Sequence, residues 1–163
     1  MKSISKIWST AAVLLLTTSS FAQISKVEII ATGLTCSMCS NAINKQLKTL
    51  PEVTKVDTDL DKSTFVILLK SNNDLTPAQF KAKVEKAGFS VGSMVVTIAE
   101  KTATSAPYLA INKPEQSANY HKIKLLDKGY VSAKDFKKLA LQHKELQKLA
   151  SKNDFVFHFQ YLD

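Results

Sequence analysis

Apolar and polar residues alternate in short blocks along the first two thirds of the chain. Residues 26–31, 53–59, 64–69 and 91–98 have the length and residue pattern of strands, and in the first of them Val27 and Ile29 share one face while Glu28 lies on the other. The block at 64–69 is apolar on both faces, which predicts a central position in a sheet. These blocks predict strands, and the longer segments that separate some of them leave room for helices.

Two of the intervening segments have the three- to four-residue spacing of an amphipathic helix. The first is expected to end at Pro51. Its apolar stripe consists of Cys39, Ile43, Leu47 and Leu50. The second begins at Thr76 and Pro77, because the threonine can cap the helix and proline suits its first turn, and it ends before Gly88. The order of elements predicts an α+β fold, a ferredoxin-like βαββαβ sandwich with both helices on one face of an antiparallel sheet.

The pattern changes beyond residue 98. Residues 99–106 are rich in Ala, Thr and Ser and are expected to form a linker. Residues 107–163 are expected to form a small α+β C-terminal unit of unknown role. Within this unit we predict a strand at 121–126, a helix from 132 to about 150, and a closing strand over 155–161 in which aromatic residues alternate.

Residues 1–22 have the composition of a secretory signal peptide. Lys2 and Lys6 provide a positive start, residues 7–16 are apolar, and residues 20–22 form a small-x-small cleavage site. The apolar stretch is shorter than the roughly 20 residues that span a bilayer. We therefore expect export, cleavage and a periplasmic protein without stable membrane insertion. An uncleaved membrane tether is the alternative.

The chain is basic, and its charge is unevenly distributed. The formal net charge is +8, and all 22 positive residues are lysines. Residues 23–100 carry nine lysines against eight acidic residues, whereas residues 101–163 carry eleven against six. Arginine, the usual bidentate reader of bases and phosphates, is absent, which argues against a nucleic-acid partner. A solvated lysine-rich face in the C-terminal part is the expected role of this charge.

Cys36 and Cys39 are the only cysteines, and they lie where the first strand gives way to the first helix. Thiolate sulfur prefers soft cations such as Cu(I), and a helix N-terminus favours the thiolate form. An exported dithiol has three interpretations: a Cu(I)-type soft-metal site, which we favour, a redox-active pair, or a static disulfide. Structural zinc would require four ligands, and only two are local.

The segment G-L-T-C-S-M-C at residues 33–39 resembles the G-M-T-C-x-x-C signature of heavy-metal-associated domains. This family is the soft-metal module of copper chaperones, copper-transporting ATPases and periplasmic mercury-binding proteins. Leu34 replaces the usual Met, which has a similar volume. Residues 86–89 resemble the A-G-F segment that shields the metal loop in this family, with Phe89 as the covering residue. The resemblance implies a heavy-metal-associated domain over residues 23–98.

The resemblance also implies that Cys36 and Cys39 are the metal ligands and that Cu(I) is the cargo. Thr35 supports copper, because relatives that handle zinc or cadmium tend to have Asp there. We expect a metallochaperone or scavenger that passes the ion by ligand exchange to a copper-transporting or copper-receiving protein, and we do not expect an enzyme. The alternatives are a periplasmic Hg(II)-binding protein and a thiol-disulfide oxidoreductase. The oxidoreductase fits poorly, because Ser37 and Met38 stand where such motifs usually have Gly, Pro or His.

Further residues carry donor atoms for soft metals. Met38 is a possible third donor, although we expect its side chain to point away from the cysteines. His121, His143 and His158 show no recognisable ligand spacing. A second metal site in the C-terminal unit is therefore the less favoured interpretation of these histidines.

Overall fold

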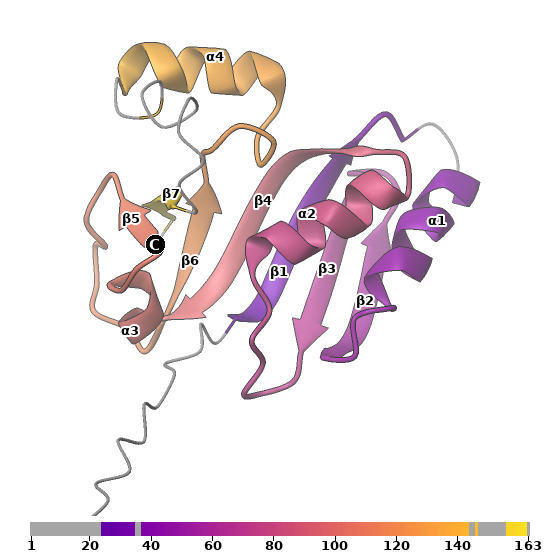
Figure 1. Cartoon of the computed structure of the whole chain (residues 1–163), viewed down its shortest axis with the longest axis horizontal. Coiled ribbons are helices and arrows are strands. Elements are labelled where there is room, and N and C mark those ends of the chain that lie inside the picture. The colour runs from indigo at the N-terminus through magenta and orange to yellow at the C-terminus, as the bar shows by residue number, and fades with distance from the viewer. Residues whose placement is uncertain (1–23, 35–36, 144–145, 147–155, 163) are drawn as a thin grey trace, which may run out of the picture.

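The computed structural model describes residues 24–34, 37–143, 146 and 156–162, and these residues are built around a seven-stranded sheet (Figure 1). The elements in chain order are β1 (Ile24–Thr32), α1 (Ser37–Leu47), β2 (Val53–Asp59), β3 (Thr64–Leu69), α2 (Pro77–Lys86), β4 (Ser90–Ala99), α3 (Glu100–Ala103), β5 (Tyr108–Ala110), β6 (Tyr120–Leu125), α4 (Ala133–Gln142) and β7 (Phe157–Tyr161). The strands lie side by side in the order β2-β3-β1-β4-β6-β7-β5.

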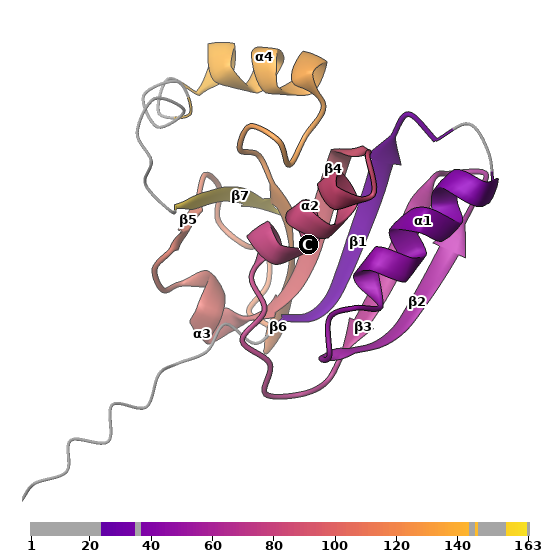
Figure 2. The same ribbon diagram turned by 45° about the vertical axis from the view of Figure 1, so that its right-hand side comes forward.

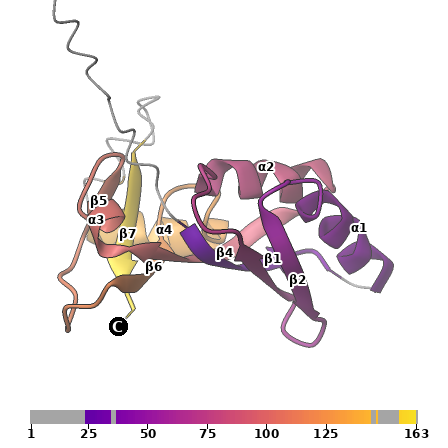
Figure 3. The same cartoon turned by 90° about the horizontal axis from the view of Figure 1, so that it is seen from below.

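The elements from β1 to β4 form the predicted ferredoxin-like arrangement. β1 lies between β3 and β4 and is antiparallel to both, and β2 is antiparallel to β3 at one edge of the sheet. Figure 3 shows α1 and α2 on the same face of these strands. The predicted fold class is therefore confirmed, and β2 and β3 have the bounds that the sequence predicts.

The start of α2 follows directly from its sequence. Thr76 is the N-cap residue and Pro77 begins the helix. The side-chain oxygen of Gln79 accepts a hydrogen bond from the backbone N–H of Thr76 at 2.7 Å. This bond satisfies a backbone donor that lies before the first helical turn, as a capping box does.

The C-terminal half continues the same sheet. β6 is antiparallel to β4, with Val95 opposite Lys124 and Ala99 opposite Tyr120. β7 is antiparallel to β6, and the short β5 lies parallel to β7 at the far edge. The predicted strands correspond to β6 and β7, and α4 begins after the expected cap Ser132, whose side chain accepts from a backbone N–H of the first turn. The expected end of this helix near residue 150 lies outside the described residues.

The segment 99–106, expected to be a linker, is folded. Ala99 ends β4, residues 100–103 form α3, and both Thr102 and Ala103 are buried. The prediction of a linker was wrong because small residues such as Ala and Thr also suit a tightly packed helical turn, and composition does not distinguish the two settings. The division of the chain into a domain at 23–98 and a unit at 107–163 stays a prediction.

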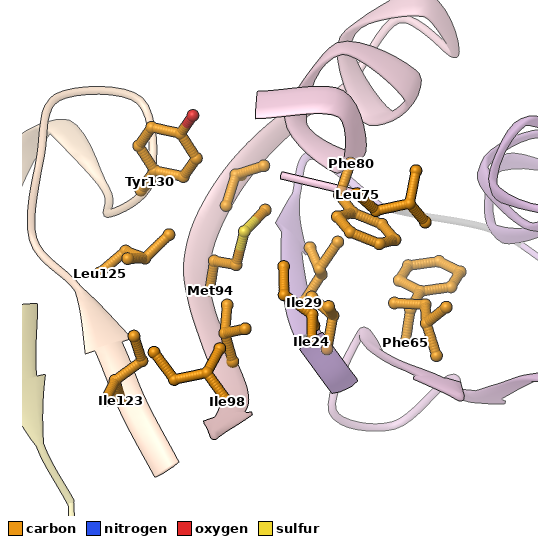
Figure 4. Packing of buried hydrophobic residues seen from close by; sticks show 14 of the residues in the cluster. Ile24, Ile29, Phe65, Leu75, Phe80, Met94, Ile98, Ile123, Leu125 and Tyr130 are labelled. Carbon is orange, nitrogen blue, oxygen red and sulfur yellow. The ribbon is translucent and has the colours of Figure 1, made fainter. Parts of the chain in front are cut away.

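Both halves contribute to one contiguous hydrophobic core. Figure 4 shows Met94 and Ile98 of β4 between Ile29 of β1 and the β6 side chains Ile123 and Leu125. All five side chains are fully buried. The N-terminal and C-terminal halves are therefore joined by apolar packing as well as by the hydrogen bonds between β4 and β6.

The region of the predicted signal peptide lies outside the described residues, so cleavage and export stay predictions. Among the helices that the structure describes, none is both long enough and apolar enough to cross a bilayer.

Candidate metal centre

The connection between β1 and α1 carries the predicted metal motif. It begins at Gly33, whose φ of +83° lies in the left-handed region that glycine adopts without strain. Leu34 is half-buried and packs against the hydrophobic core. Leucine thus packs against the core at the sequence position that methionine has in the family signature. Thr35 and Cys36 lie outside the described residues, so the role of Cys36 stays a prediction.

Cys39 lies in the first turn of α1 and is half-buried. The residues that follow it on the same stripe, Ile43 and Leu47, are fully buried beneath the helix, and Leu50 is buried just beyond its end. The predicted apolar stripe is therefore confirmed. It holds α1 against the sheet and places Cys39 at the boundary between the core and solvent.

The N-terminus of α1 favours negative charge. The backbone N–H groups of a first helical turn lack acceptors within the helix, and the helix dipole adds a partial positive charge there. The first turn of α1 contains no acidic side chain that could compensate this charge. A thiolate at Cys39 is consequently better stabilised than it would be in the middle of the helix.

Three segments that are distant in sequence meet at the base of the metal loop. The Thr32 hydroxyl donates a hydrogen bond to the Ser90 carbonyl at 3.2 Å, and the backbone N–H of Ala31 donates to the Ser63 carbonyl at 3.1 Å. A Cβ atom on Gly92 would lie 2.6 Å from the Thr32 side chain, so glycine is needed for this close approach. The sequence reading missed these contacts, although a glycine inside a strand pattern is a known signal of close backbone approach.

The end of α2 brings Phe89 to the same region. The backbone N–H of Phe89 donates to the Val84 carbonyl at 3.2 Å and that of Gly88 donates to the Glu85 carbonyl at 2.9 Å, the paired bonds of a Schellman motif. Gly88 has a φ of +89°, as this motif requires. Phe89 is half-buried and packs against the core. Shielding of the thiols by its ring stays a prediction.

Potential additional ligands do not gather around the motif in the described part of the chain. The side chain of Met38 is 82% exposed, and its expected orientation away from the cysteines stays a prediction because Cys36 lies outside the described residues. The described residues contain no group of three or more His, Cys, Asp or Glu side chains arranged to hold a metal ion. A four-ligand zinc cage is therefore not formed by the residues that the structure describes.

Two histidines of the C-terminal half, His121 and His158, are buried and contact neighbouring side chains. The buried His121 ring packs edge-on against Tyr161, with 5.0 Å between ring centroids. His158 is also buried, and its Nδ1 lies 2.7 Å from an Asp127 carboxylate oxygen. The register of β6 and β7 places His121 and His158 on opposite faces of the sheet, because Leu125 pairs with Phe159. These two histidines therefore do not share a site, and His143 is the C-cap residue of α4.

Comparison with known families identifies the part of the chain that contains the cysteine motif. The family model of the heavy-metal-associated domain matches residues 28–90. These residues form a heavy-metal-associated domain. The match begins within β1 and covers the cysteine motif, α1, α2 and the Phe89 segment. It ends where β4 begins, so the C-terminal half lies outside the matched region.

Several solved structures resemble the heavy-metal-associated domain. The yeast copper transporter domain Ccc2a, solved in apo and Cu(I)-loaded states, is 34% identical over 41% of this chain and 90% of that chain, with a TM-score of 0.37. The CopZ metallochaperone is 22% identical over 41% of this chain and 98% of that chain, with a TM-score of 0.38. The N-terminal domain of PacS from Synechocystis PCC6803 is 20% identical over 40% of this chain and 91% of that chain, with a TM-score of 0.36. No curated protein matches the chain.

Proposed function

We propose that the protein binds one Cu(I) ion through Cys36 and Cys39 and passes it to a partner. The position of Cys39 carries this proposal: it lies half-buried in the first turn of α1, within a heavy-metal-associated domain. Cys36 precedes it by three residues in the sequence. Two thiolates match the preference of Cu(I) for soft, polarisable ligands.

Transfer of the Cu(I) ion to a partner requires that the ion can dissociate from the two cysteines. A site with two sulfur ligands leaves room for an incoming thiolate or thioether to bind before Cys36 or Cys39 is released. A closed cage of four ligands, as in structural zinc sites, would resist this exchange. The exposure of Ser37 and Met38 beside Cys39 supports the proposal, because a partner could approach the motif from this side.

The cellular setting is part of the proposal. The signal-like residues 1–22 favour export to the periplasm, where the partner would be a copper-transporting or copper-receiving protein. The protein would act as a carrier or scavenger rather than as an enzyme. Sequencing the N-terminus of the protein from a periplasmic fraction tests the location, with Gln23 as the expected first residue. A full-length protein in the membrane fraction would contradict cleavage.

The copper site is tested by competition with a chromophoric Cu(I) chelator under anaerobic, reducing conditions. We expect the protein to withdraw one equivalent of Cu(I) from the chelator. The double variant Cys36→Ser, Cys39→Ser should lose this ability. The matched control is Met38→Leu, which changes an exposed sulfur beside the pair and should leave the affinity unchanged. Equal competition by the double variant and the wild type would refute the proposal.

Thiol labelling separates a metal carrier from the other readings of the cysteine pair. In the folded, reduced protein we expect iodoacetamide to modify both cysteines, Cys36 faster than the half-buried Cys39, and prior loading with Cu(I) to suppress both reactions. A pair that resists millimolar glutathione and does not label would be a static disulfide. Tighter binding of Hg(II) than of Cu(I) in cells, or insulin-reducing activity that depends on Cys36, would favour the respective alternative over copper transport.

A further inference from the structure

A groove of about 690 Å³ separates α4 from the heavy-metal-associated domain. One side comes from the end of β1 and the start of β4, including Thr32 and Val91. The other comes from the segment that leads into α4, including Val131, and from the first turns of α4, including Phe136. Figure 2 shows α4 beyond the end of the sheet at which β1 ends and α1 begins. The groove therefore lies at the same end of the molecule as the start of α1, and most of its lining residues lie outside the family match.

The groove has an apolar interior. Val91 and Val131 are buried at 4% exposure each, and Phe136 of α4 is half-buried. Hydroxyl groups of Thr32 and Ser90 border this apolar surface. Concave sites of about 300–1,000 Å³ with apolar linings and a few polar groups are typical of small-molecule binding, and they often lie between structural units.

Contacts with α2 and β4 hold the wall that precedes α4 in place. A Cβ atom on Gly129 would lie 2.5 Å from Cε of Lys81, so the absence of a side chain there lets the two segments approach closely. The Lys81 ammonium lies 5.9 Å from the centroid of the Tyr130 ring, and Val131 forms an isolated bridge with Ser93 of β4. The residues on both sides of the groove are thus held in place by packing contacts.

The charges around the groove favour an anion. Lys128 and Lys137 line it, and neither forms an ion pair with any residue that the structure describes. Glu85 also lines it, but its carboxylate already pairs with Lys81 at 2.9 Å. The uncompensated charge at the rim is therefore positive. The first turn of α4 also borders the groove, although Asp135 already occupies part of that helix end through its bond to Ser132.

We propose that this groove binds a small amphipathic carboxylate, with its apolar part against Val91, Val131 and Phe136 and its carboxylate near Lys128 and Lys137. The apolar interior provides the affinity by burial, and the lysines select the sign of the charge. This site does not depend on the cysteines, so it can be tested in the metal-free protein. Because both lysines are exposed, their contribution is expected to decrease as the salt concentration rises.

Isothermal titration of the full chain with decanoate tests the proposal, and decyltrimethylammonium serves as the cationic probe with the same alkyl chain. We expect saturable binding of one decanoate and at least tenfold weaker binding of the cation. The double variant Lys128→Glu, Lys137→Glu should weaken decanoate binding about tenfold, since each exposed charge contributes modestly. The matched control is Lys48→Glu, an exposed lysine outside the groove that should bind as the wild type does. Circular dichroism confirms that each variant is folded.

Other outcomes overturn the proposal. Equal binding of the two probes would show that the lysines do not select an anion. Unchanged decanoate binding in the double lysine variant or in Phe136→Asp would place the ligand elsewhere. If decanoate does not bind and the wild type dimerises in a manner that Phe136→Asp abolishes, the groove is an interface between two copies of the chain and not a ligand site.

Discussion

Substitution of Tyr108 tests how the packing of β5 against β7 contributes to the stability of the C-terminal half. It begins β5, is 7% exposed, and its hydroxyl oxygen is buried without a hydrogen-bond partner among the described residues. Its ring packs against Phe157, with 5.5 Å between centroids, and edge-on against Phe159 at 6.3 Å. The substitution Tyr108→Phe keeps these ring contacts and removes only the unsatisfied hydroxyl.

The expected effect of Tyr108→Phe is a gain in stability. A buried polar group without a partner costs about 1–3 kcal/mol relative to water. Phenylalanine fills nearly the same space, so no cavity offsets this gain. We therefore expect the free energy of unfolding at pH 7 to rise by about 1 kcal/mol or more.

The same residue predicts a dependence on alkaline pH. Burial, assisted by the nearby Tyr130, raises the pKa of Tyr108 well above its ordinary value of 10.0. In the unfolded chain the hydroxyl ionises near its ordinary pKa, so the unfolded state loses a proton above pH 10 that the folded state retains. The wild type therefore loses stability as the pH rises through this range, by about 1.4 kcal/mol at pH 11. The variant lacks this loss, and its advantage over the wild type should grow by that amount.

Urea unfolding followed by far-ultraviolet circular dichroism at pH 7 and pH 11 measures both effects. The matched control is Tyr120→Phe, because Tyr120 is 50% exposed and its hydroxyl can reach water. The control should change the free energy of unfolding by less than about 0.5 kcal/mol at pH 7. A loss of stability in Tyr108→Phe at pH 7, or an equal difference from the wild type at both pH values, would refute the reasoning.

Two further substitutions test the elements around the metal loop and the groove. Gly88→Ala should lower the free energy of unfolding by about 1–2 kcal/mol, because its φ of +89° is costly for a residue with Cβ while no described atom crowds that position; an unchanged thermal midpoint would contradict the Schellman ending of α2. Asp127→Ala should cost about 2 kcal/mol in urea unfolding, because the buried His158 would lose the carboxylate that contacts both Nδ1 and its backbone N–H at 2.7 Å. The control is Asp59→Ala, which removes an exposed carboxylate that lies 3.7 Å from the Lys62 ammonium and should lower the free energy of unfolding by less than about 1 kcal/mol. Similar losses in the two variants would count against a structural role of the Asp127–His158 pair.

Local signals in the sequence were sufficient to predict most helices and strands of the N-terminal half. The apolar run of β3 and the capping residues of α2 concern neighbours within a few positions, so the sequence alone predicted these elements with correct type and close bounds. The cysteine motif is local too, since its spacing and its place before a helix follow from seven consecutive residues, 33–39. These features depend on backbone preferences that act before the chain has folded.

The C-terminal half was predicted less completely. The short strand β5 was missed, because three residues carry too little alternation and Tyr108 pairs with Phe157, far along the chain. The helix α3 was read as a linker for the related reason that Thr102 and Ala103 owe their burial to residues distant in sequence. In both segments the free energy comes from contacts that close only in the folded protein, so no short window contains the signal.

The sequence by itself determined the family, the order of the first six elements and the position of the two thiols, because each of these depends on the spacing of nearby residues. Only the tertiary structure decided that β6 extends the sheet from β4, that Thr32 and Ser90 join below the metal loop, and that Lys128 and Lys137 face the apolar wall around Val91. Hydrogen bonds between strands and the burial of apolar surface bring together residues that are far apart in the chain. Their partners are selected by the geometry of the whole fold rather than by local preference.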